Sequence, residues 1–417
     1  MKIALFTDCY TPEVGGVQVA VNTLRQGLLG RGHDVTVFAT SHPDATPEPG
    51  IVRLPSATFT PVPEIRMATP VDLIARSLIN RASFDLIHTH TELMVGQFGW
   101  RAATRLRLPL VHTYHTMYED LTWYVARDTR LTRPAGRLVE ILSRRVCNNA
   151  DCVIAPTRKT RDKLLGYGVD TPIRIAPTGV DTSRFAREAA DPRSLDRLRA
   201  SLGIAPDAQV LLSLGRVAVE KNVPRLVDEV AAYLKPADPD LAERRGRVVL
   251  LIAGDGRAMR LVKDRVASAG IADRVYFAGE VPWQDVPQYY HLSDVFVSLS
   301  ATETQGLTYI EALAAGVPLV AQNNECFEGI LEDGISASLF QHPAAFHERL
   351  DDVLFTGQRA RYIAGGYAVV EALSVERCAE SVETIYEETR EAYPSDIASR
   401  HLGRRPRLGP ALPVPAR

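Results

Sequence analysis

The chain has 417 residues, of which 46% are hydrophobic and 24% charged, and its formal net charge at pH 7 is -2. This composition is typical of globular protein, and the length suffices for two domains. It excludes disordered, fibrous and disulfide-stapled chains. The longest apolar runs are far shorter than the roughly 18 residues that a membrane-spanning helix needs, and the N-terminal run meets Asp8 too early for a signal peptide. We therefore expect a cytoplasmic protein.

Short β-branched runs alternate with helical patterns through the first half of the chain. The runs cover residues 3–7, 34–39, 85–88, 110–113, 152–155 and 173–176. Such alternation predicts a parallel sheet covered by helices on both faces. We expect it to form a Rossmann-like domain over residues 1–190.

A polar stretch at residues 186–208 interrupts the alternation, and we interpret it as the linker between domains. Further runs follow at residues 210–214, 248–253, 275–278, 295–299, 318–321 and 338–340. They predict a second doubly wound domain over residues 205–373, with the two parallel sheets facing across a cleft. An acidic helical pattern at 374–393 is expected to join the first domain, and the Pro- and Arg-rich tail at 395–417 to be disordered.

Neither the cysteines nor one pair of aspartates has the sequence context of a metal site. The five cysteines are scattered without a CxxC or Cys/His spacing, so we expect reduced, structural thiols. Asp238 and Asp240 match the residue pattern of a metal-binding DxD motif, but they lie in a polar loop ahead of a predicted strand. We therefore predict no metal site.

Two glycines, Gly15 and Gly16, stand between the first predicted strand and the helical pattern that follows it. Glycines at a helix N-terminus let backbone amides approach a phosphate or a sugar closely. An ordinary tight turn gives the same pattern, so this pair alone leaves both interpretations open.

Candidate anion ligands follow the first strands of the second domain. Arg216 and Lys221 lie five residues apart in the loop after residues 210–214, and Gly254, Asp255 and Gly256 follow the next strand. Ligands of doubly wound folds bind at this edge of the sheet. A planar guanidinium together with a mobile ammonium suits a diphosphate, although two cations in one loop are also found on ordinary surfaces.

The segment SATETQGLTYIEALAAGVP at residues 300–318 is the most informative part of the sequence. It predicts a helix that opens near Gly306 and Leu307 and ends at Gly316, with Glu303 in the loop and Glu311 on the second helical turn. A fully helical span of eight residues would be at most about 12 Å long. Carboxylates that act on one glycosidic bond lie roughly 5 to 10 Å apart, usually on different elements. We therefore interpret the two glutamates as residues that bind different parts of one long ligand.

Together these motifs, with the strand end His112-Thr113-Tyr114-His115-Thr116, resemble glycosyltransferase family 4. This family contains retaining enzymes of the GT-B fold, which has two Rossmann-like α/β domains. Within this family, the sequence of the segment ETQGLTYIEALAAG most resembles that of the bacterial 1,2-diacylglycerol 3-glucosyltransferases. The resemblance covers about residues 1–390.

The resemblance implies that residues 1–190 form the acceptor-side domain and residues 205–373 the nucleotide-sugar donor-binding domain. It also implies a role for each motif. Arg216 and Lys221 would bind the donor diphosphate, Glu311 the ribose hydroxyls, and Glu303 the hydroxyls of the donor sugar. The amides after Gly306 would face the sugar and phosphate, and the backbone around Gly254, Asp255 and Gly256 would contact the nucleotide. Gly15 and Gly16 would approach the diphosphate from the other domain, and His115 would contact the transferred sugar. His88, His90 and His112 are other candidates for that role, and His115 could instead only cap the end of its strand.

The implied reaction is transfer of a hexose, most simply glucose from UDP-glucose, to a lipid acceptor such as 1,2-diacylglycerol with formation of an α-glycosidic bond. Since no carboxylate is placed as a nucleophile, front-face displacement is implied, and fixed cations take the place of a metal. No tightly bound cofactor and no nucleic acid is expected. The alternatives are GDP-mannose as donor, phosphatidylinositol or a soluble glycan as acceptor, a sugar-nucleotide epimerase or hydrolase, and a non-catalytic scaffold.

A basic amphipathic segment points to a membrane surface. Arginines are interleaved with aliphatic residues in one predicted helical region, at Arg127, Arg130, Arg133, Arg137, Arg144 and Arg145. Such a segment can lie on an anionic bilayer, or it can be the solvated face of an ordinary helix. The lipid acceptor favours the first interpretation, so we expect a peripheral protein at the inner face of the cell membrane.

Overall fold

The computed structural model describes residues 1–13, 15–58, 66–69, 79, 82–116, 129–187 and 190–393, with only the backbone for residues 129–135. The chain divides into two compact units. The first contains Met1–Gly179 and the segment that begins at Val375, and the second is Val180–Ser374. The predicted tail at 395–417 and Arg127 lie outside the described residues.

The first unit is built on a seven-stranded sheet of order β3-β2-β1-β6-β7-β8-β9, in which all neighbours are parallel. Its strands are β1 (Lys2–Thr7), β2 (Asp34–Thr40), β3 (Ile51–Leu54), β6 (Leu86–Thr89), β7 (Leu110–Thr113), β8 (Cys152–Ala155) and β9 (Ile173–Ile175). The short strands β4 (Ser56–Thr58) and β5 (Arg66–Ala68) form a separate antiparallel pair. Its helices are α1 (Gly16–Gly30), α3 (Met94–Leu106), α5 (Thr129–Asn148), α6 (Arg158–Gly166) and α16 (Val375–Ala392).

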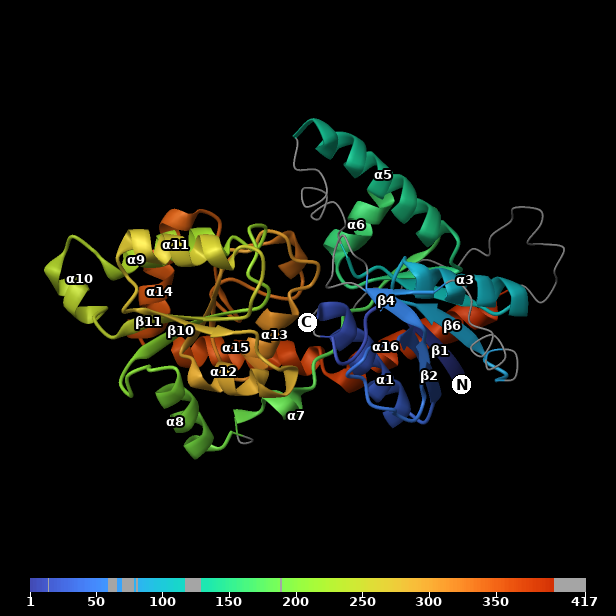
Figure 1. Ribbon diagram of the computed structural model, residues 1–417, viewed down its shortest axis with the longest axis horizontal. Helices are drawn as coiled ribbons and strands as arrows, with labels where there is room; N and C mark the ends of the chain where they lie inside the picture. The colour runs from blue at the N-terminus through green and yellow to red at the C-terminus, as the bar shows by residue number, and fades with distance from the viewer. Residues whose placement is uncertain are drawn as a thin grey trace. The chain divides into compact units, whose positions relative to one another are not determined.

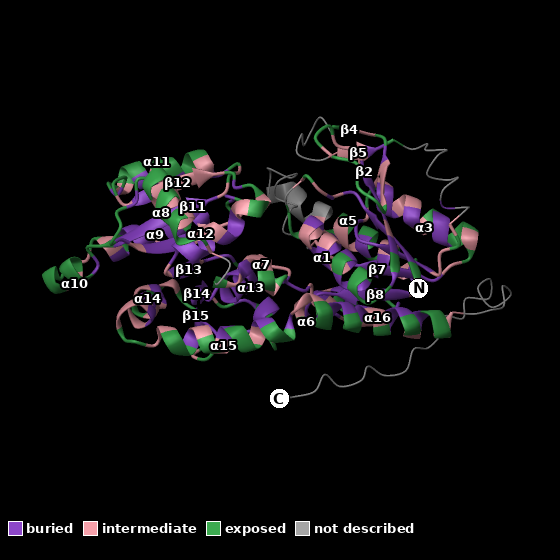
Figure 2. Cartoon of the chain, turned by 90° about the horizontal axis from the view of Figure 1, so that it is seen from below, coloured by how far each residue is buried: buried purple, intermediate pink, exposed green. Residues whose placement is uncertain are grey.

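Successive residues of β1 enter different cores, as expected for a strand buried on both faces. Ile3 and Leu5 pack with side chains of α1 and α16, whereas Ala4 and Phe6 pack with side chains of α3, α5 and α6. Figure 2 shows central strands of this sheet, such as β7 and β8, buried and the outer faces of the helices exposed. The sheet is therefore fixed from both sides, and its carboxyl edge presents the loops.

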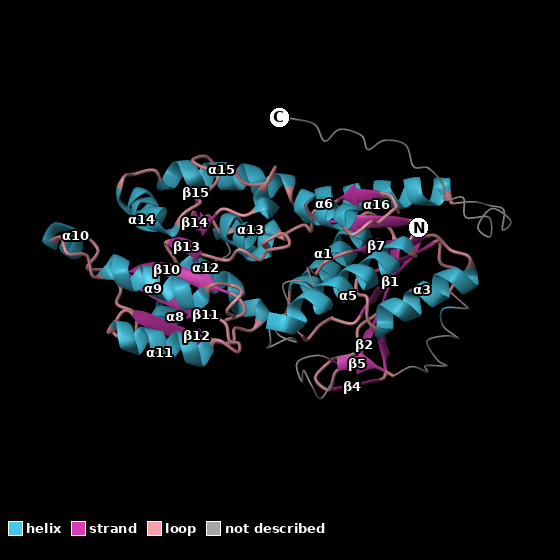
Figure 3. Cartoon of the chain, turned by 90° about the horizontal axis from the view of Figure 1, so that it is seen from above, coloured by secondary structure: helices cyan, strands magenta, loops and turns pink. Residues whose placement is uncertain are grey.

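The second unit has a six-stranded parallel sheet of order β12-β11-β10-β13-β14-β15. Its strands are β10 (Gln209–Leu214), β11 (Val248–Ala253), β12 (Val275–Gly279), β13 (Val295–Ser298), β14 (Leu319–Gln322) and β15 (Ser338–Phe340). Its α-helices are α7 (Thr182–Phe185), α8 (Pro192–Ser201), α9 (Val223–Leu234), α10 (Pro239–Arg244), α11 (Met259–Ala269), α12 (Val286–Leu292), α13 (Leu307–Ala314), α14 (Phe346–Phe355) and α15 (Arg359–Ala372). The described residues of this unit also form the short 3-10 helices η3 (Trp283–Asp285), η4 (Glu325–Phe327) and η5 (Pro343–Ala345). Within this unit α9 and α11 lie on one side of the sheet and α12 on the other (Figures 1 and 3).

The predicted pair of doubly wound parallel sheets is confirmed, with β3 as an additional edge strand. The polar stretch 186–208, expected as the linker, lies within the second unit, and the chain crosses between units at Gly179 and Val180 instead. The stretch packs locally because the Arg199 guanidinium donates to the carbonyls of Ala205 and Ala208, and α8 contacts α12. Among the described residues, no helix is long and apolar enough to cross a bilayer.

Candidate active site

The residues predicted to bind a donor gather at the carboxyl edge of the second sheet. Strand β10 is flanked by β11 on one side and by β13 on the other, so the connections diverge at this point. Doubly wound folds bind their ligands at such a switch point. The loops after β10, β11 and β13 carry the predicted residues at positions 216–221, 254–256 and 303–306.

Lys221 and Glu303 form an ion pair at this edge. The Lys221 ammonium donates to Glu303 Oε1 at 2.8 Å and to the carbonyl of Thr302 at 3.2 Å. The side-chain amide of Asn222 donates to the carbonyl of Leu299 at 2.8 Å, and this bond links the same two loops. The two side chains remain 26% and 13% exposed. A lysine ammonium and a carboxylate are therefore held side by side at this edge of the sheet.

Arg216 lies in the same loop and is the more exposed of the two cations. Its Nη2 lies 2.8 Å from Oε1 of Glu220, and the Arg216 side chain is 51% exposed. Glu220 is nearly buried, and its backbone carbonyl accepts from the Thr302 hydroxyl at 3.0 Å. Glu220 thus anchors Arg216 at a site where half of the side chain still faces solvent.

Gly306 directly precedes α13, as predicted. Its φ of 80° lies in the left-handed region, and a Cβ there would come within 2.9 Å of the Tyr309 ring and 3.3 Å of Phe327. Gly306 also has no side chain that could accept from the first amides of α13. The amides that start at Leu307 therefore face the loop edge, where a helix N-terminus favours an anion.

Glu311 lies one helical turn further along α13 and is only 7% exposed. The hydroxyl of Tyr290, on α12, donates to its Oε2 at 2.9 Å. Burial raises the pKa of Glu311 to about 7, while the Tyr290 hydrogen bond and the Arg184 charge oppose that rise. Glu311 is therefore fixed by its neighbours and changes its charge near neutral pH.

The glycines of the Gly254-Asp255-Gly256 loop have a packing role that the sequence did not indicate. A Cβ on Gly254 would overlap the carbonyl of Gly215, and a Cβ on Gly256 would overlap that of Val217. Backbone hydrogen bonds from Gly215 N to Ala253 O and from Val217 N to Asp255 O, both 2.9 Å, join these two loops. The glycines thus let the loops after β10 and β11 pack backbone to backbone, with Asp255 exposed.

In the first unit, Gly15 and Gly16 lie where β1 leads into α1. Gly15 has φ 177° and ψ 163°, an extended conformation open to any residue, and a Cβ there would meet nothing within 4 Å. Neither backbone strain nor protein packing therefore requires a glycine at position 15. That leaves open space beside the N-terminus of α1.

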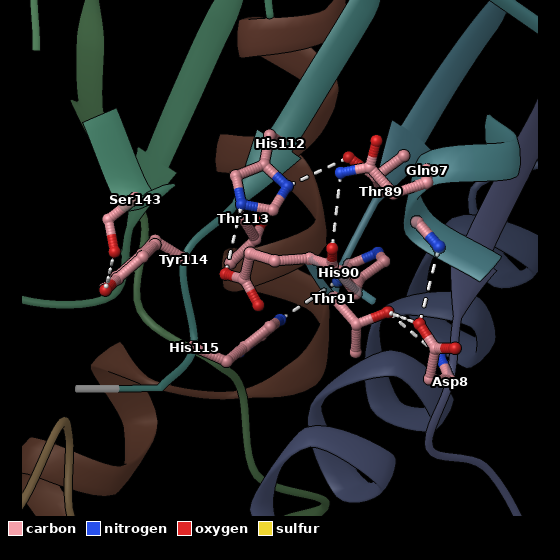
Figure 4. Close-up of polar contacts among 12 residues, drawn as sticks. Asp8, Thr89, His90, Thr91, Gln97, His112, Thr113, Tyr114, His115 and Ser143 are labelled. Carbon is pink, nitrogen blue, oxygen red and sulfur yellow. Dashed lines mark hydrogen bonds and ion pairs between the residues drawn. The ribbon is translucent and has the colours of Figure 1, made fainter. Parts of the chain in front are cut away.

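Four histidines, at positions 88, 90, 112 and 115, lie at or next to the carboxyl ends of β6 and β7. Figure 4 shows three of them, His90, His112 and His115. His90 Nδ1 lies 3.0 Å from His115 Nε2, and the two rings face each other from neighbouring strand ends. His88 is fully buried between the Tyr386 hydroxyl at 2.6 Å and the Thr113 hydroxyl at 2.7 Å. Burial lowers the pKa of His88 and His90, and that of His115 to about 3. These three rings are therefore neutral at pH 7.

The other three histidines, His88, His90 and His112, are buried. His112 is 1% exposed, with Nδ1 2.9 Å from the Thr89 hydroxyl and Nε2 3.4 Å from Glu92 Oε1. His88 and His90 are at most 2% exposed. His115 alone among the four is partly exposed, and it lines a pocket together with His90, Thr113 and residues of α1 and α16. This arrangement favours His115 as the ring that meets a ligand.

Asp238 caps a helix. Its carboxylate accepts from the Asp240 amide at 2.9 Å at the start of α10, and Pro239 occupies the first helical turn. Helix capping therefore accounts for the sequence Asp238-Pro239-Asp240. In the described part of the chain, no group of three or more His, Cys, Asp or Glu side chains is arranged to hold a metal ion.

Comparison with family models matches both halves of the chain. The model described as Glycosyltransferase Family 4 matches residues 14–184, and that described as Glycosyl transferases group 1 matches residues 195–375.

Two curated relatives carry the name alpha-monoglucosyldiacylglycerol synthase. That of Streptococcus pneumoniae is 36% identical over 342 residues, which cover 82% of this chain and 75% of the relative. That of Acholeplasma laidlawii is 30% identical over 82% of this chain and 85% of the relative. A D-inositol 3-phosphate glycosyltransferase of Actinosynnema mirum is 30% identical over 93% of this chain and 95% of its own length.

Solved structures share the fold. HepE of Anabaena, in complex with UDP and glucose, superposes with a TM-score of 0.69 at 18% identity and covers 93% of this chain and 99% of its own. Sucrose-phosphate synthase of Thermosynechococcus elongatus gives 0.68 at 20% identity, with 94% of this chain and 99% of its own covered. The predicted GT-B fold class is confirmed.

Proposed function

Because the chain belongs to glycosyltransferase family 4, we propose that it moves glucose from UDP-glucose to 1,2-diacylglycerol and forms an α-glycosidic bond. Hexosyl transfer follows from the family, whereas the donor, the acceptor and the residue roles are the proposal. The observation that carries it is 36% identity over 342 residues to a relative named alpha-monoglucosyldiacylglycerol synthase. The second relative of that name supports it.

The donor-side residues of the second unit suit a nucleotide diphosphate sugar. In the proposal Arg216 and Lys221 bind the diphosphate together with the first amides of α13 after Gly306. Glu311 accepts hydrogen bonds from the ribose hydroxyls, and the backbone at 254–256 contacts the nucleotide. Support comes from the shared location of these groups at the switch point of one sheet.

Glu303 and Lys221 would act on opposite ends of the bond that breaks. As the sugar–phosphate bond lengthens, negative charge grows on the leaving diphosphate and positive charge grows on the sugar ring. Lys221 stabilises the first, and Glu303, held 2.8 Å away, accepts from the sugar hydroxyls beside the second. The acceptor hydroxyl attacks on the face that the diphosphate leaves and gives its proton to the departing phosphate oxygen, so the anomeric configuration is retained.

His115 would contact the transferred sugar through an uncharged ring. A cationic imidazole would oppose the positive charge that develops on the sugar. The lowered pKa of His115, about 3, removes that conflict at pH 7. The ring can then donate or accept one hydrogen bond without adding charge to the sugar site.

Helix α5 supports a lipid acceptor. Leu138, Ile141 and Leu142 are 57%, 52% and 51% exposed, and their spacing places them on one face of the helix. Arg137, Arg144 and Arg145 are exposed beside them, whereas the side chains of residues 129–135 lie outside the described part. Aliphatic side chains that enter a bilayer, flanked by arginines that meet anionic headgroups, suit a peripheral protein at the inner face of the cell membrane.

The test is a matrix of donors and acceptors with products resolved by mass. Purified protein is incubated with UDP-glucose, UDP-galactose or GDP-mannose, and with anionic vesicles that contain diacylglycerol or phosphatidylinositol. We expect glucosyl-diacylglycerol from UDP-glucose at a rate well above every other pair. A different preferred donor, or no lipid product, would overturn the proposal.

A soluble acceptor is the second candidate. The inositol phosphate glycosyltransferase of Actinosynnema mirum aligns with more of the chain than either diacylglycerol relative. The same matrix therefore includes D-inositol 3-phosphate and a soluble glycan. Preference for either would replace diacylglycerol as the acceptor while leaving the donor assignment intact.

A further inference from the structure

The role of His90 is not given by the motifs that identify the family site. His90 follows β6, is 2% exposed, and lies with its Nδ1 3.0 Å from Nε2 of His115. The ring centroids are 5.3 Å apart and the planes differ by 23°. The other nitrogen of His90, Nε2, is buried and has no hydrogen-bond partner among the described residues. His90 therefore meets His115 through a single hydrogen bond.

The hydrogen bond couples the proton positions of the two rings. Each neutral imidazole carries one N–H, and only one of the two facing nitrogens can carry it. Either His90 Nδ1–H donates, and His115 then carries its own proton on Nδ1, or His115 Nε2–H donates and His90 carries its proton on Nε2. The tautomer of His90 thus fixes the tautomer of His115.

Burial distinguishes the two arrangements. With the proton of His90 on Nε2, a buried N–H would have no acceptor among the described residues. With that proton on Nδ1, it is used in the bond to His115, and Nε2 remains a bare acceptor. Orphaned buried N–H groups are rarer in proteins than unsatisfied acceptors. The geometry therefore favours His90 as the donor.

We propose that His90 is a positioning residue that donates its Nδ1–H to Nε2 of His115, so that His115 presents Nδ1–H to an oxygen of the bound sugar. The described part of the chain places no hydrogen-bond partner on His115 Nδ1. This inference rests on the proposed contact between His115 and the donor sugar. In this role His115 is a hydrogen-bond donor through Nδ1–H alone.

Neighbouring polar groups do not compete for His115. Both nitrogens of His88 are engaged by the hydroxyls of Tyr386 and Thr113. Both nitrogens of His112 face Thr89 and Glu92. The thiol of Cys378 lines the same pocket, and burial raises its pKa to about 12, so it stays uncharged. The state of His115 is therefore set by the ring of His90.

The kinetic test uses two substitutions at His90. His90→Phe keeps an aromatic ring but removes the donor, whereas His90→Asn places an amide nitrogen near the position of Nδ1. We expect His90→Phe to lower kcat at least about tenfold, with KM for UDP-glucose and the affinity for UDP within about twofold of wild type. His90→Asn should recover kcat to within about threefold. Equal loss in two folded variants, or wild-type kcat in His90→Phe, would overturn the proposal.

The spectroscopic test needs no substrate. In histidine-labelled wild-type protein, ¹⁵N chemical shifts should show a protonated Nδ1 and an unprotonated Nε2 for His115, assigned by loss of the signals in His115→Ala. The same shifts measured on His90→Asn should keep this tautomer. A protonated Nε2 on His115 in wild type would overturn the inference, even if His90→Phe failed to fold. If the acceptor or donor proves different, the proposed function fails while the tautomer assignment stands or falls on these spectra.

Discussion

Lys221 and Glu303 in the second unit form an ion pair whose side chains are 26% and 13% exposed, whereas His90 and His115 in the first unit are joined by a hydrogen bond between neutral rings. The first pair retains access to water, and its charges are already oriented. The second is built from groups that burial keeps uncharged. Charge is therefore placed where a phosphate can meet it, and neutral donors are placed where an ion would be costly.

The same difference separates the two glutamates of the α13 segment. Glu303 is paired with a lysine, whereas Glu311 is buried against the hydroxyl of Tyr290. Burial raises the pKa of Glu311 to about 7, so its charge changes near neutral pH. Substitutions that remove charge should act mainly at the proposed phosphate site, and changes in pH should act mainly at Glu311.

Removal of the Lys221 charge should have the largest effect. Lys221→Ala would take away the proposed charge-assisted bond to the diphosphate, worth about 1.5 to 3 kcal/mol, so turnover should fall about 10- to 100-fold. Arg216→Ala should act in the same direction. Lys263→Ala, on the exposed face of α11, is the matched control and should retain wild-type turnover. Wild-type turnover in both folded site variants would remove the diphosphate assignment.

Charge on α5 should matter for membrane attachment and not for the donor. Arg144→Ser with Arg145→Ser should lower the affinity for anionic vesicles roughly 30-fold at low salt, with a smaller difference at high salt. Hydrolysis of UDP-glucose in solution should not change. The control is Arg193→Ser with Arg197→Ser, which removes the same charge from exposed positions on α8. Equal loss in the control pair would show that net charge, and not α5, sets attachment.

The affinity for UDP-glucose should depend on the charge of Glu311. Its pKa is raised to about 7, and the ionised carboxylate is the better acceptor for ribose hydroxyls. Affinity should therefore fall about tenfold as the pH is lowered from 8 to 6. Calorimetry without acceptor measures this directly, because the diphosphate ester has no group that titrates in the range. Glu311→Gln should show weaker binding that no longer varies with pH, and an identical pH dependence in both proteins would contradict the assignment.

The smallest effect should come from Tyr290. Tyr290→Phe removes one neutral-to-charged hydrogen bond to Glu311 without opening a cavity, so UDP-glucose affinity at pH 8 should fall about fivefold. The pKa of Glu311 should rise further, because the lost bond favoured the ionised form. The pH at which affinity declines should then move upward. An unchanged pH midpoint would show that Tyr290 does not support the carboxylate.

The sequence predicts what depends on local pattern. Runs of β-branched residues indicate both parallel sheets, and Gly306 and Gly316 mark the ends of α13 because both have left-handed φ values. The position of Arg216 and Lys221 at a sheet edge follows from the strand that precedes them. These features depend on residues close together along the chain.

The pairings across the fold could not be predicted from the sequence. Tyr290 reaches Glu311 from a different helix, and His90 reaches His115 because β6 and β7 pair in the sheet. In the sequence, the glycines at 254 and 256 indicate a turn that contacts a ligand. In the structure, their missing Cβ atoms leave room for the loop after β10. The crossing at Gly179 was missed because a polar stretch can pack onto its domain through backbone carbonyls, as Arg199 does.

Glucosyl transfer to diacylglycerol with retention is tested most directly by the anomeric configuration of the product. Wild-type protein is incubated with UDP-glucose and anionic vesicles that contain diacylglycerol, and the purified glycolipid is examined by proton NMR. We expect a single glucosyl residue with the small anomeric coupling of an α-linkage. A β-linked product would contradict the proposed front-face displacement, and the absence of any glucosylated diacylglycerol would contradict the proposed acceptor.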